Sequence, residues 1–302
     1  MGAVVAAIAA SIGGGLVAER GLGERARRLS SAVLGAMFWV GIPFVTFFSL
    51  ARLHVTTGVG AGLALGYLEL TIVGAAAYLI GARFLRLPRA STGALVLVVV
   101  LVNTGYLGLP LARTLLGSGQ LAPAIAFDSL VSGPMFYLGG LAIGAAFGAM
   151  AHRQGGGHLR AVVRNPPLLA AIAGLLAPNV LAPEALVHAA HAVVYAMLVT
   201  GFFVLGVNLA GEAEHGWLRL PLTRPVAAAV VLRLLVAPAL MAGLSATVVA
   251  VPHAYLFQAA MPSGINSLVV AHAYGLDLRL TSSALAWTTA VAIAAAIVGA
   301  AL

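Results

Sequence analysis

Two clusters of helix-breaking and neutral polar residues could form an anion-binding site in this chain. They occupy residues 103–110 and 261–266, and each lies inside an otherwise apolar stretch. Proline lacks a backbone donor and glycine permits irregular backbone, so a helix that runs through either cluster must break. The second part of a broken helix begins with free amides at its positive end, which favours an anion such as a carboxylate. The candidate binding residues are Asn103, Thr104, Gly105, Gly108, Pro110, Pro262, Ser263, Gly264 and Asn266.

Three charged residues lie well inside apolar stretches, where the cost of a charge makes each one a functional candidate. Asp128 follows the first cluster, and its carboxylate could bind a proton or a cation, or could make fixed hydrogen bonds. Glu69 and Arg233 occupy the third and eighth apolar stretches and could form a buried, structural ion pair. Glu69 is also a second, weaker candidate for ion coupling.

The histidines and the missing catalytic motifs argue against metal or enzyme chemistry. His188 and His191 have the spacing of half a metal site, but no third ligand is evident, so we expect an interfacial role and no metal. His272 follows the second cluster and could change its charge near neutral pH. The chain has no serine-hydrolase, zinc-protease or nucleotide-binding motif. We therefore expect no enzyme activity and no cofactor, and any uphill transport would have to be driven by an Na+ or H+ gradient or by the membrane potential.

The composition excludes a soluble protein. Of the 302 residues, 62% are apolar and 8% are charged, whereas about a quarter are charged in a soluble domain. All sixteen basic residues are arginines, and most lie between apolar stretches, which indicates a protein in a lipid bilayer rather than one that binds nucleic acid. There is no cysteine, so neither a disulfide nor a cysteine-ligated metal is expected.

Ten stretches are apolar and long enough to cross a bilayer, which takes about 20 residues. Thirteen arginines follow the odd-numbered stretches, and two lie on the opposite side. We expect the protein to lie in a bacterial inner membrane. Because arginine accumulates on the cytoplasmic side, both termini should then lie outside the cytoplasm. The stretches are 3–18, 31–51, 58–82, 92–116, 120–148, 166–183, 187–210, 225–249, 253–275 and 280–301.

Ten spans divide into two halves of five, and an odd number per half gives the halves opposite orientations. We expect a first repeat over residues 1–150, a short cytoplasmic linker over 151–165 and a second repeat over 166–302. The two breaks then fall in the fourth and ninth spans, at matching positions, as in many secondary transporters. The sequence therefore predicts an all-α polytopic membrane protein with ten helices in two inverted repeats.

Five short motifs are spread along nearly the whole chain. They are Gly41-Ile42-Pro43-Phe44, Asn103-Thr104 with Gly108-Leu109-Pro110-Leu111, Arg164-Asn165-Pro166, Gln258-Ala259-Ala260-Met261-Pro262 and Ala271-His272-Ala273-Tyr274-Gly275. Together they resemble the auxin efflux carrier family, which includes bacterial transporters and the plant auxin exporters within the bile-acid/auxin transporter superfamily. The resemblance implies a scaffold and a transport unit, helices four and nine that cross at their prolines, and an organic anion bound beside that crossing. It also allows a homodimer.

Three residues can be compared singly with this family. Asn103 matches the asparagine expected to contact a substrate carboxylate, and Thr46, three residues after Pro43, matches a small hydroxyl position on helix two. Asp128 stands where plant relatives have an amide side chain. An acid there could signal proton or cation coupling, and it argues against transferring specificity for auxin to this chain.

We therefore expect a secondary transporter that moves a small organic anion, such as a carboxylate, across the inner membrane by alternating access. The alternative is a sodium-coupled symporter or a cation/proton antiporter of similar crossover fold. A membrane sensor and a membrane enzyme are weaker alternatives, since neither a signalling domain nor a catalytic motif is evident.

Overall fold

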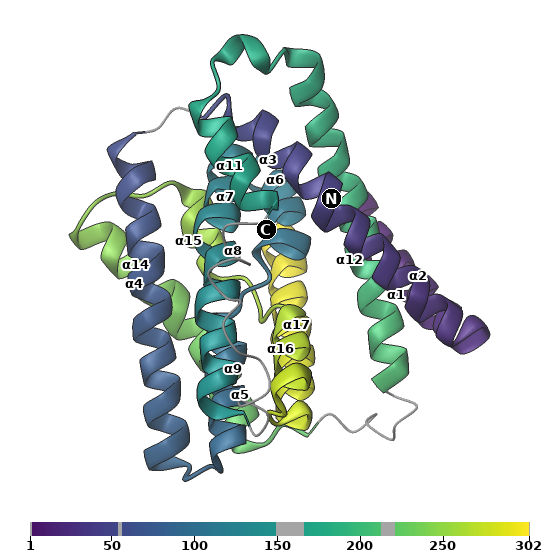
Figure 1. Ribbon diagram of the computed structural model, residues 1–302, viewed down its shortest axis with the longest axis vertical. Helices are drawn as coiled ribbons and strands as arrows, with labels where there is room; N and C mark the ends of the chain where they lie inside the picture. The colour runs from purple at the N-terminus through teal and green to yellow at the C-terminus, as the bar shows by residue number, and fades with distance from the viewer. Residues whose placement is uncertain (1, 54–55, 149–165, 213–220, 302) are drawn as a thin grey trace.

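Every named element in the described part of the chain is helical (Figure 1). The computed structural model describes residues 2–53, 56–148, 166–212 and 221–301. The protein is membrane-embedded, and the count of ten spans in two inverted repeats stays a prediction. Within the described ranges, four helical segments are long and apolar enough to cross a membrane, Thr57–Phe84, Ser118–Phe147, Arg224–Thr247 and Leu278–Val298, and two more are apolar but shorter, Trp39–Leu50 and Arg89–Val100.

The N-terminal helices differ from the sequence-based expectation of a charged loop after the first span. Only Gly23, with a positive φ of 48°, separates α1 (Gly2–Leu22) from α2 (Glu24–Ala36). An ion pair stabilises this bend, because Arg27 Nη2 lies 2.6 Å from Oε1 of the fully buried Glu19. The arginines that were expected in a loop therefore lie on helices. A π-helical turn (Met37–Gly41) then leads from α2 into α3 (Ile42–Leu50).

Short π-helical turns join several of the remaining helices of the first half into longer segments. Thr56 caps the first of them, since its hydroxyl accepts a hydrogen bond from the amide of Val59. The helices are α4 (Thr57–Leu79), α5 (Arg89–Val100), α6 (Leu109–Leu115), α7 (Leu121–Phe127), α8 (Gly133–Met135) and α9 (Leu141–Phe147), with π-helical turns η2 (Ile80–Phe84), η3 (Thr104–Gly108), η5 (Asp128–Ser132) and η6 (Phe136–Gly140) and the 3-10 turn η4 (Ser118–Gln120).

The second half begins with a short helix and a long one. These are α11 (Pro166–Leu176), followed by the 3-10 turn η8 (Asn179–Leu181), and α12 (Glu184–Glu212). The later helices are α13 (Arg224–Val231), α14 (Ala237–Thr247), α15 (His253–Ala259), α16 (Asn266–Tyr274) and α17 (Leu278–Ala301), with the π-helical turn η10 (Leu232–Val236) between α13 and α14.

The helices form a main bundle and a slanted arm in which α1 packs along α12 (Figure 1). Two glycines permit this close packing. A Cβ atom on Gly15 would collide with the backbone of Phe203, and one on Gly206 would collide with the backbone of Ile12. Small residues of this kind let membrane helices approach closely.

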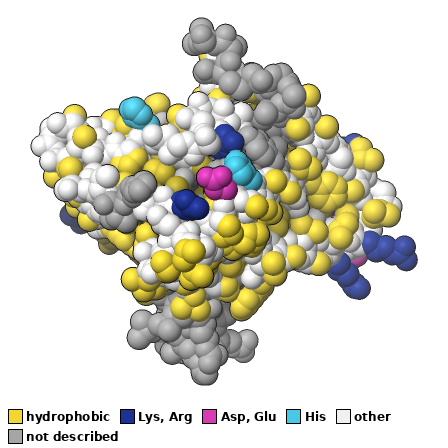
Figure 2. Space-filling model, turned by 90° about the horizontal axis from the view of Figure 1, so that it is seen from above, with side chains coloured by type: hydrophobic (Ala, Val, Ile, Leu, Met, Phe, Trp, Pro, Cys, Tyr) yellow, Lys and Arg dark blue, Asp and Glu magenta, His cyan; other side chains and the backbone are white. Residues whose placement is uncertain are grey.

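The surface is apolar, as expected for a protein that faces lipid. Large apolar side chains such as Trp39, Phe84, Leu176 and Val180 are exposed. Seen from above, hydrophobic side chains cover much of the face, and most of the few charged ones gather near its middle and at its right edge (Figure 2). Inside the bundle, the last nine residues of α5, from Thr92 to Val100, are all buried. The break that follows α5 therefore lies in the core.

Candidate functional site at the crossing of two broken helices

The two helix breaks predicted from the sequence meet in space. Val102 and Ser263 form an isolated antiparallel bridge. The amide of Asn103 donates to the carbonyl oxygen of Pro262 at 2.8 Å. The amide of Gly264 donates to the carbonyl oxygen of Leu101 at 2.7 Å. Two segments that are far apart in the sequence thus cross as a short extended pair, which satisfies backbone groups that a broken helix would leave free.

The first break differs in detail from the expectation that the chains cross at both prolines. Pro262 lies at the crossing, but Pro110 lies beyond it, near the start of α6. The extended backbone of Leu101 ends α5, and the side chain of Asn103 caps the next turn by accepting from the amide of Leu107 at 3.3 Å. Proline fits the first turn of a helix, where its missing donor is not needed, so Pro110 begins α6 rather than making the crossing.

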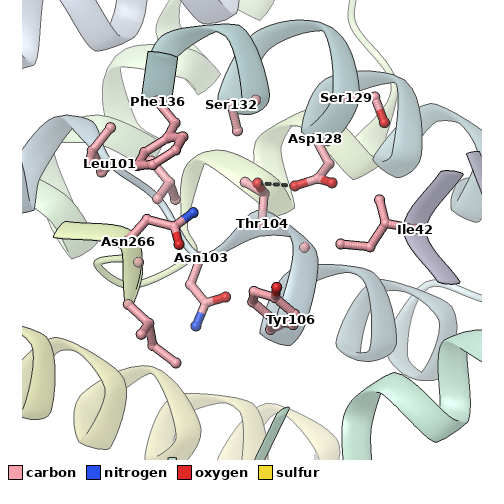
Figure 3. Close-up of a pocket in the computed structure, with 15 residues that line it drawn as sticks. Ile42, Leu101, Asn103, Thr104, Tyr106, Asp128, Ser129, Ser132, Phe136 and Asn266 are labelled. Carbon is pink, nitrogen blue, oxygen red and sulfur yellow. Dashed lines mark hydrogen bonds between the residues drawn. The ribbon is translucent and has the colours of Figure 1, made fainter. Parts of the chain in front are cut away.

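A cavity adjoins the crossing, and side chains from several elements line it (Figure 3). It has about 90 Å³ of space that water-sized groups can occupy. Its walls come from the first break, from η5 and α8, from the start of α16 and from α3. The lining residues are Ile42, Leu101, Val102, Asn103, Thr104, Gly105, Tyr106, Asp128, Ser129, Ser132, Gly133, Phe136, Gly264, Ile265 and Asn266.

Asp128 is the one charged side chain among these lining residues. The hydroxyl of Thr104 donates to Asp128 Oδ1 at 2.5 Å (Figure 3). A Cβ atom on Gly105 would lie 3.2 Å from the same oxygen, so glycine leaves room for the carboxylate against the backbone. The carboxylate is therefore held directly against the first break.

A second, smaller cavity lies next to the same break. Asn103, Tyr106 and Ile265 line both cavities, and the second one also reaches Phe202 of α12 and Thr289 of α17. The hydroxyl of Thr289 is buried and has no hydrogen-bond partner within the described residues. Asn103, Tyr106 and Ile265 thus lie between two neighbouring cavities.

Comparison with known proteins supports the family resemblance. A profile described as membrane transport protein matches residues 150–298. An uncharacterised transporter of Methanocaldococcus jannaschii is 26% identical over 285 residues, which is 88% of this chain and 86% of the archaeal protein. Both matches support the resemblance to the auxin efflux carrier family of membrane transporters. With 88% of the chain aligned, the similarity to the archaeal transporter runs through both helix breaks.

The other predicted binding residues of the transporter lie outside the cavity and support its walls. Thr46 lies behind the wall, 3.2 Å from the hydroxyl of the lining residue Ser129. The hydroxyl of Ser263 donates to the carbonyl oxygen of Val98 at 2.6 Å. Gly108 packs against Gln258 and Met261. Pro110 and Pro262 are buried and do not line the cavity.

Several lining residues were not singled out from the sequence. Ser132 and Phe136 follow Asp128 by four and eight residues, a spacing that places them on the same face of a helix. That helical periodicity could have identified them. Tyr106 and Ile265 lie inside the two predicted breaks, but irregular backbone gives no periodicity from which to predict the direction of a side chain.

Glu69 and Arg233 lie together behind the crossing. Both side chains are fully buried, and Arg233 Nη2 is 3.4 Å from Glu69 Oε1. Arg233 also donates to the carbonyl oxygens of Val99, at 2.9 Å, and Ala259. The pair does not line the cavity.

The histidines lie away from the crossing site. His188 on α12 and His272 on α16 are exposed, and the side chain of His191 lies outside the described residues. Across the ranges that the structure describes, no group of three His, Cys, Asp or Glu residues could hold a metal ion.

Proposed function

We propose that this transporter moves a small organic anion, with a carboxylate as its recognised group, across the inner membrane by alternating access at the crossing. The observation that supports the proposal is the cavity beside the crossing, where Asn103, Thr104 and Asn266 meet at the starts of two half-helices. In secondary transporters, substrate sites are typically formed by such discontinuous helices.

The chemistry of the cavity favours an anion with one acidic group. The helical turn after Asn103 and helix α16, which begins at Asn266, both start at the cavity wall. The amide side chains of the two asparagines can donate hydrogen bonds, and the helix starts carry positive partial charge. A carboxylate with a small substituent fits these donors and the size of the cavity.

Asp128 would make the binding of such an anion depend on a proton or a cation. Its carboxylate lines the same cavity, and two negative charges about 4 Å apart repel each other by about 1 to 4 kcal/mol in surroundings between water and a protein surface. The substrate therefore binds best when Asp128 is neutralised. We propose a proton as the neutralising partner, which would couple transport of the anion to the proton gradient.

The two cavities next to Asn103 fit a carrier that opens alternately to each side. In the proposed mechanism the halves are inverted five-helix repeats, both termini lie outside the cytoplasm, and one unit moves against the other around the crossing. The shared residues Asn103, Tyr106 and Ile265 would stay in contact with the substrate in both states.

The test is a measurement of currents from proteoliposomes on a solid-supported membrane. Carboxylates from malonate and malate to aromatic acetates would be applied at two pH values, with Na+ or with choline. We expect saturable currents for at least one acid, lost in Asn103→Ala and kept in Asn179→Ala, which removes an exposed asparagine in η8. Unchanged binding and flux in folded Asn103→Ala, or no current with any acid, would contradict the proposal.

A second candidate is a sodium-coupled symporter or a cation/proton antiporter. The observation that favours it is the single carboxylate of Asp128 beside the hydroxyl of Thr104, since oxygen atoms of this kind could bind Na+. In that case currents should follow Na+ or pH without any acid, and Asp128→Asn should abolish them.

A further inference from the structure

The guanidinium of Arg233 joins the ends of the two broken helices and does not line the cavity. Its side chain is fully buried in the turn between α13 and α14. Nη1 donates to the carbonyl oxygen of Val99, next to the last residue of α5, at 2.9 Å. Nη2 donates to the carbonyl oxygen of Ala259, the last residue of α15.

Neighbouring donors are directed to other carbonyl groups. Near the end of α5, the hydroxyl of Ser263 serves Val98 and the amide of Gly264 serves Leu101. The amide side chain of Gln258, on α15, donates instead to the carbonyl oxygen of Thr104 at 3.3 Å. The carbonyl ends of half-helices carry negative partial charge, and in other transporters such ends coordinate the coupling cation.

Glu69 balances the charge of Arg233 rather than holding it in place. The distance between Nη2 and Glu69 Oε1 is 3.4 Å, which is longer than the bond from Nη1 to Val99. Oε2 of Glu69 and Nε of Arg233 have no hydrogen-bond partner within the described residues. The backbone carbonyl oxygens are therefore the closest partners of the guanidinium.

We propose that Arg233 is a built-in counter-cation, which takes the place at the two half-helix ends where a coupling sodium ion would otherwise bind. Transport is then independent of Na+. Arg233 is a positioning residue, because it acts through the carbonyl groups of Val99 and Ala259 and does not reach the cavity. Its effect on flux rests on the proposed anion transport, whereas its effect on ion binding does not.

The first test uses the native protein and two readouts. Thermal unfolding in detergent and acid-driven flux in proteoliposomes would be compared in NaCl and in choline chloride of equal ionic strength. We expect the same unfolding midpoint and the same flux in both salts, because an ion that bound the folded protein would raise the midpoint. A midpoint or a flux that rises with Na+ would overturn the proposal.

The second test uses Arg233→Ala, which leaves a space for a small cation. We expect a lower unfolding midpoint and loss of most of the flux, both partly restored by millimolar guanidinium chloride and not by urea, which has a similar shape without the charge. The control is Arg52→Ala, since the exposed Arg52 also donates to a carbonyl oxygen, that of Ala182 at 2.9 Å. Guanidinium should leave this control unchanged.

Further outcomes separate this inference from the proposed function. Equal rescue by urea and guanidinium, or rescue of neither readout in folded Arg233→Ala, would overturn the role of Arg233. If Arg233→Ala does not fold, the sodium comparison on the native protein decides the question. Native flux that required Na+ would overturn the role of Arg233 and leave anion transport standing. If no acid were transported, the proposed function would fail, and the midpoint in the two salts would still decide on the cation.

Discussion

The hydroxyl of Thr104 donates a 2.5 Å hydrogen bond to the carboxylate of Asp128 and so ties the first helix break to the turn between α7 and α8. Thr104 is the residue after Asn103, which caps the second half-helix. A change in the charge of Asp128 therefore acts directly on the backbone that forms the proposed binding site. In the proposed mechanism, this contact would link proton binding at Asp128 to substrate binding at Asn103.

Replacing Asp128 by asparagine should remove the pH dependence of transport. In the native protein we expect flux of a carboxylate to rise as the pH falls, because neutralising Asp128 removes the repulsion between two carboxylates. Asp128→Asn is neutral at every pH, so the acid should still bind while a pH gradient no longer drives its accumulation. The measurement is uptake into proteoliposomes with and without an imposed pH gradient.

The control for this prediction is Glu184→Gln, which removes an exposed acid at the start of α12. This variant should keep the native pH profile. If Asp128→Asn also kept the native pH dependence of transport, the assignment of proton coupling to Asp128 would be contradicted.

Removing the hydroxyl of Thr104 should destabilise the protein. Thr104→Val keeps the shape of the side chain but leaves the carboxylate of Asp128 without its donor. Loss of a hydrogen bond to a charged, poorly hydrated group costs roughly 1–3 kcal/mol, and Thr104→Ser should restore most of it. Unfolding midpoints in detergent would check this order, with Thr71→Val as the control, because the exposed Thr71 bonds only within its own helix. Equal midpoints for Thr104→Val and the native protein would contradict it.

A methyl group at Gly264 should separate the two crossing segments. A Cβ atom there would lie 3.1 Å from the carbonyl oxygen of Val102 and 3.2 Å from its carbonyl carbon. Overpacking of this kind costs about 1–3 kcal/mol, so Gly264→Ala should lower the unfolding midpoint and reduce flux. The matched control is Gly243→Ala on α14, where nothing lies within 4 Å; it should be neutral or slightly stabilising, since alanine favours helix. Similar behaviour of the two variants would contradict the close crossing.

The helix breaks were predictable because their causes are local. Proline, glycine and asparagine act on their own turn of backbone, so the clusters at residues 103–110 and 261–266 were recognisable without any knowledge of the fold. The pairing of Val102 with Ser263 is long-range, and only the resemblance to a family indicated that the breaks cross. The prediction that the segments cross at Pro110 was wrong because proline is common both at helix breaks and in the first turn of a helix.

The site itself was only partly predictable from the sequence. Asp128 was recognisable because a charge in an apolar stretch stands out, but its contact with Thr104 depends on how the η5 turn faces the crossing. The bend at Gly23 was missed because the charges around it indicated a loop, whereas the pair of Arg27 with Glu19 stabilises two helices there. Charge alone does not distinguish an exposed loop from a helix with paired charges.

The buried charges of Glu69 and Arg233 should be energetically coupled, and the two single substitutions should cost different amounts of stability. Removal of one partner leaves the other charge buried and unpaired, which typically costs about 3–5 kcal/mol. Arg233→Gln should cost more than Glu69→Gln, because Arg233 also serves the carbonyl groups of Val99 and Ala259, whereas the described contact of Glu69 is the single one at 3.4 Å.

The double variant Glu69→Gln/Arg233→Gln tests this coupling. It removes both charges, so its loss of stability should be smaller than the sum of the two single losses. It should still be less stable than the native protein, because glutamine is too short to reach the two carbonyl groups that end α5 and α15. Unfolding in detergent of the native protein and the three variants measures each term. Losses that simply added would mean that the two charges do not interact, and a double variant as stable as the native protein would mean that the carbonyl contacts of Arg233 contribute nothing.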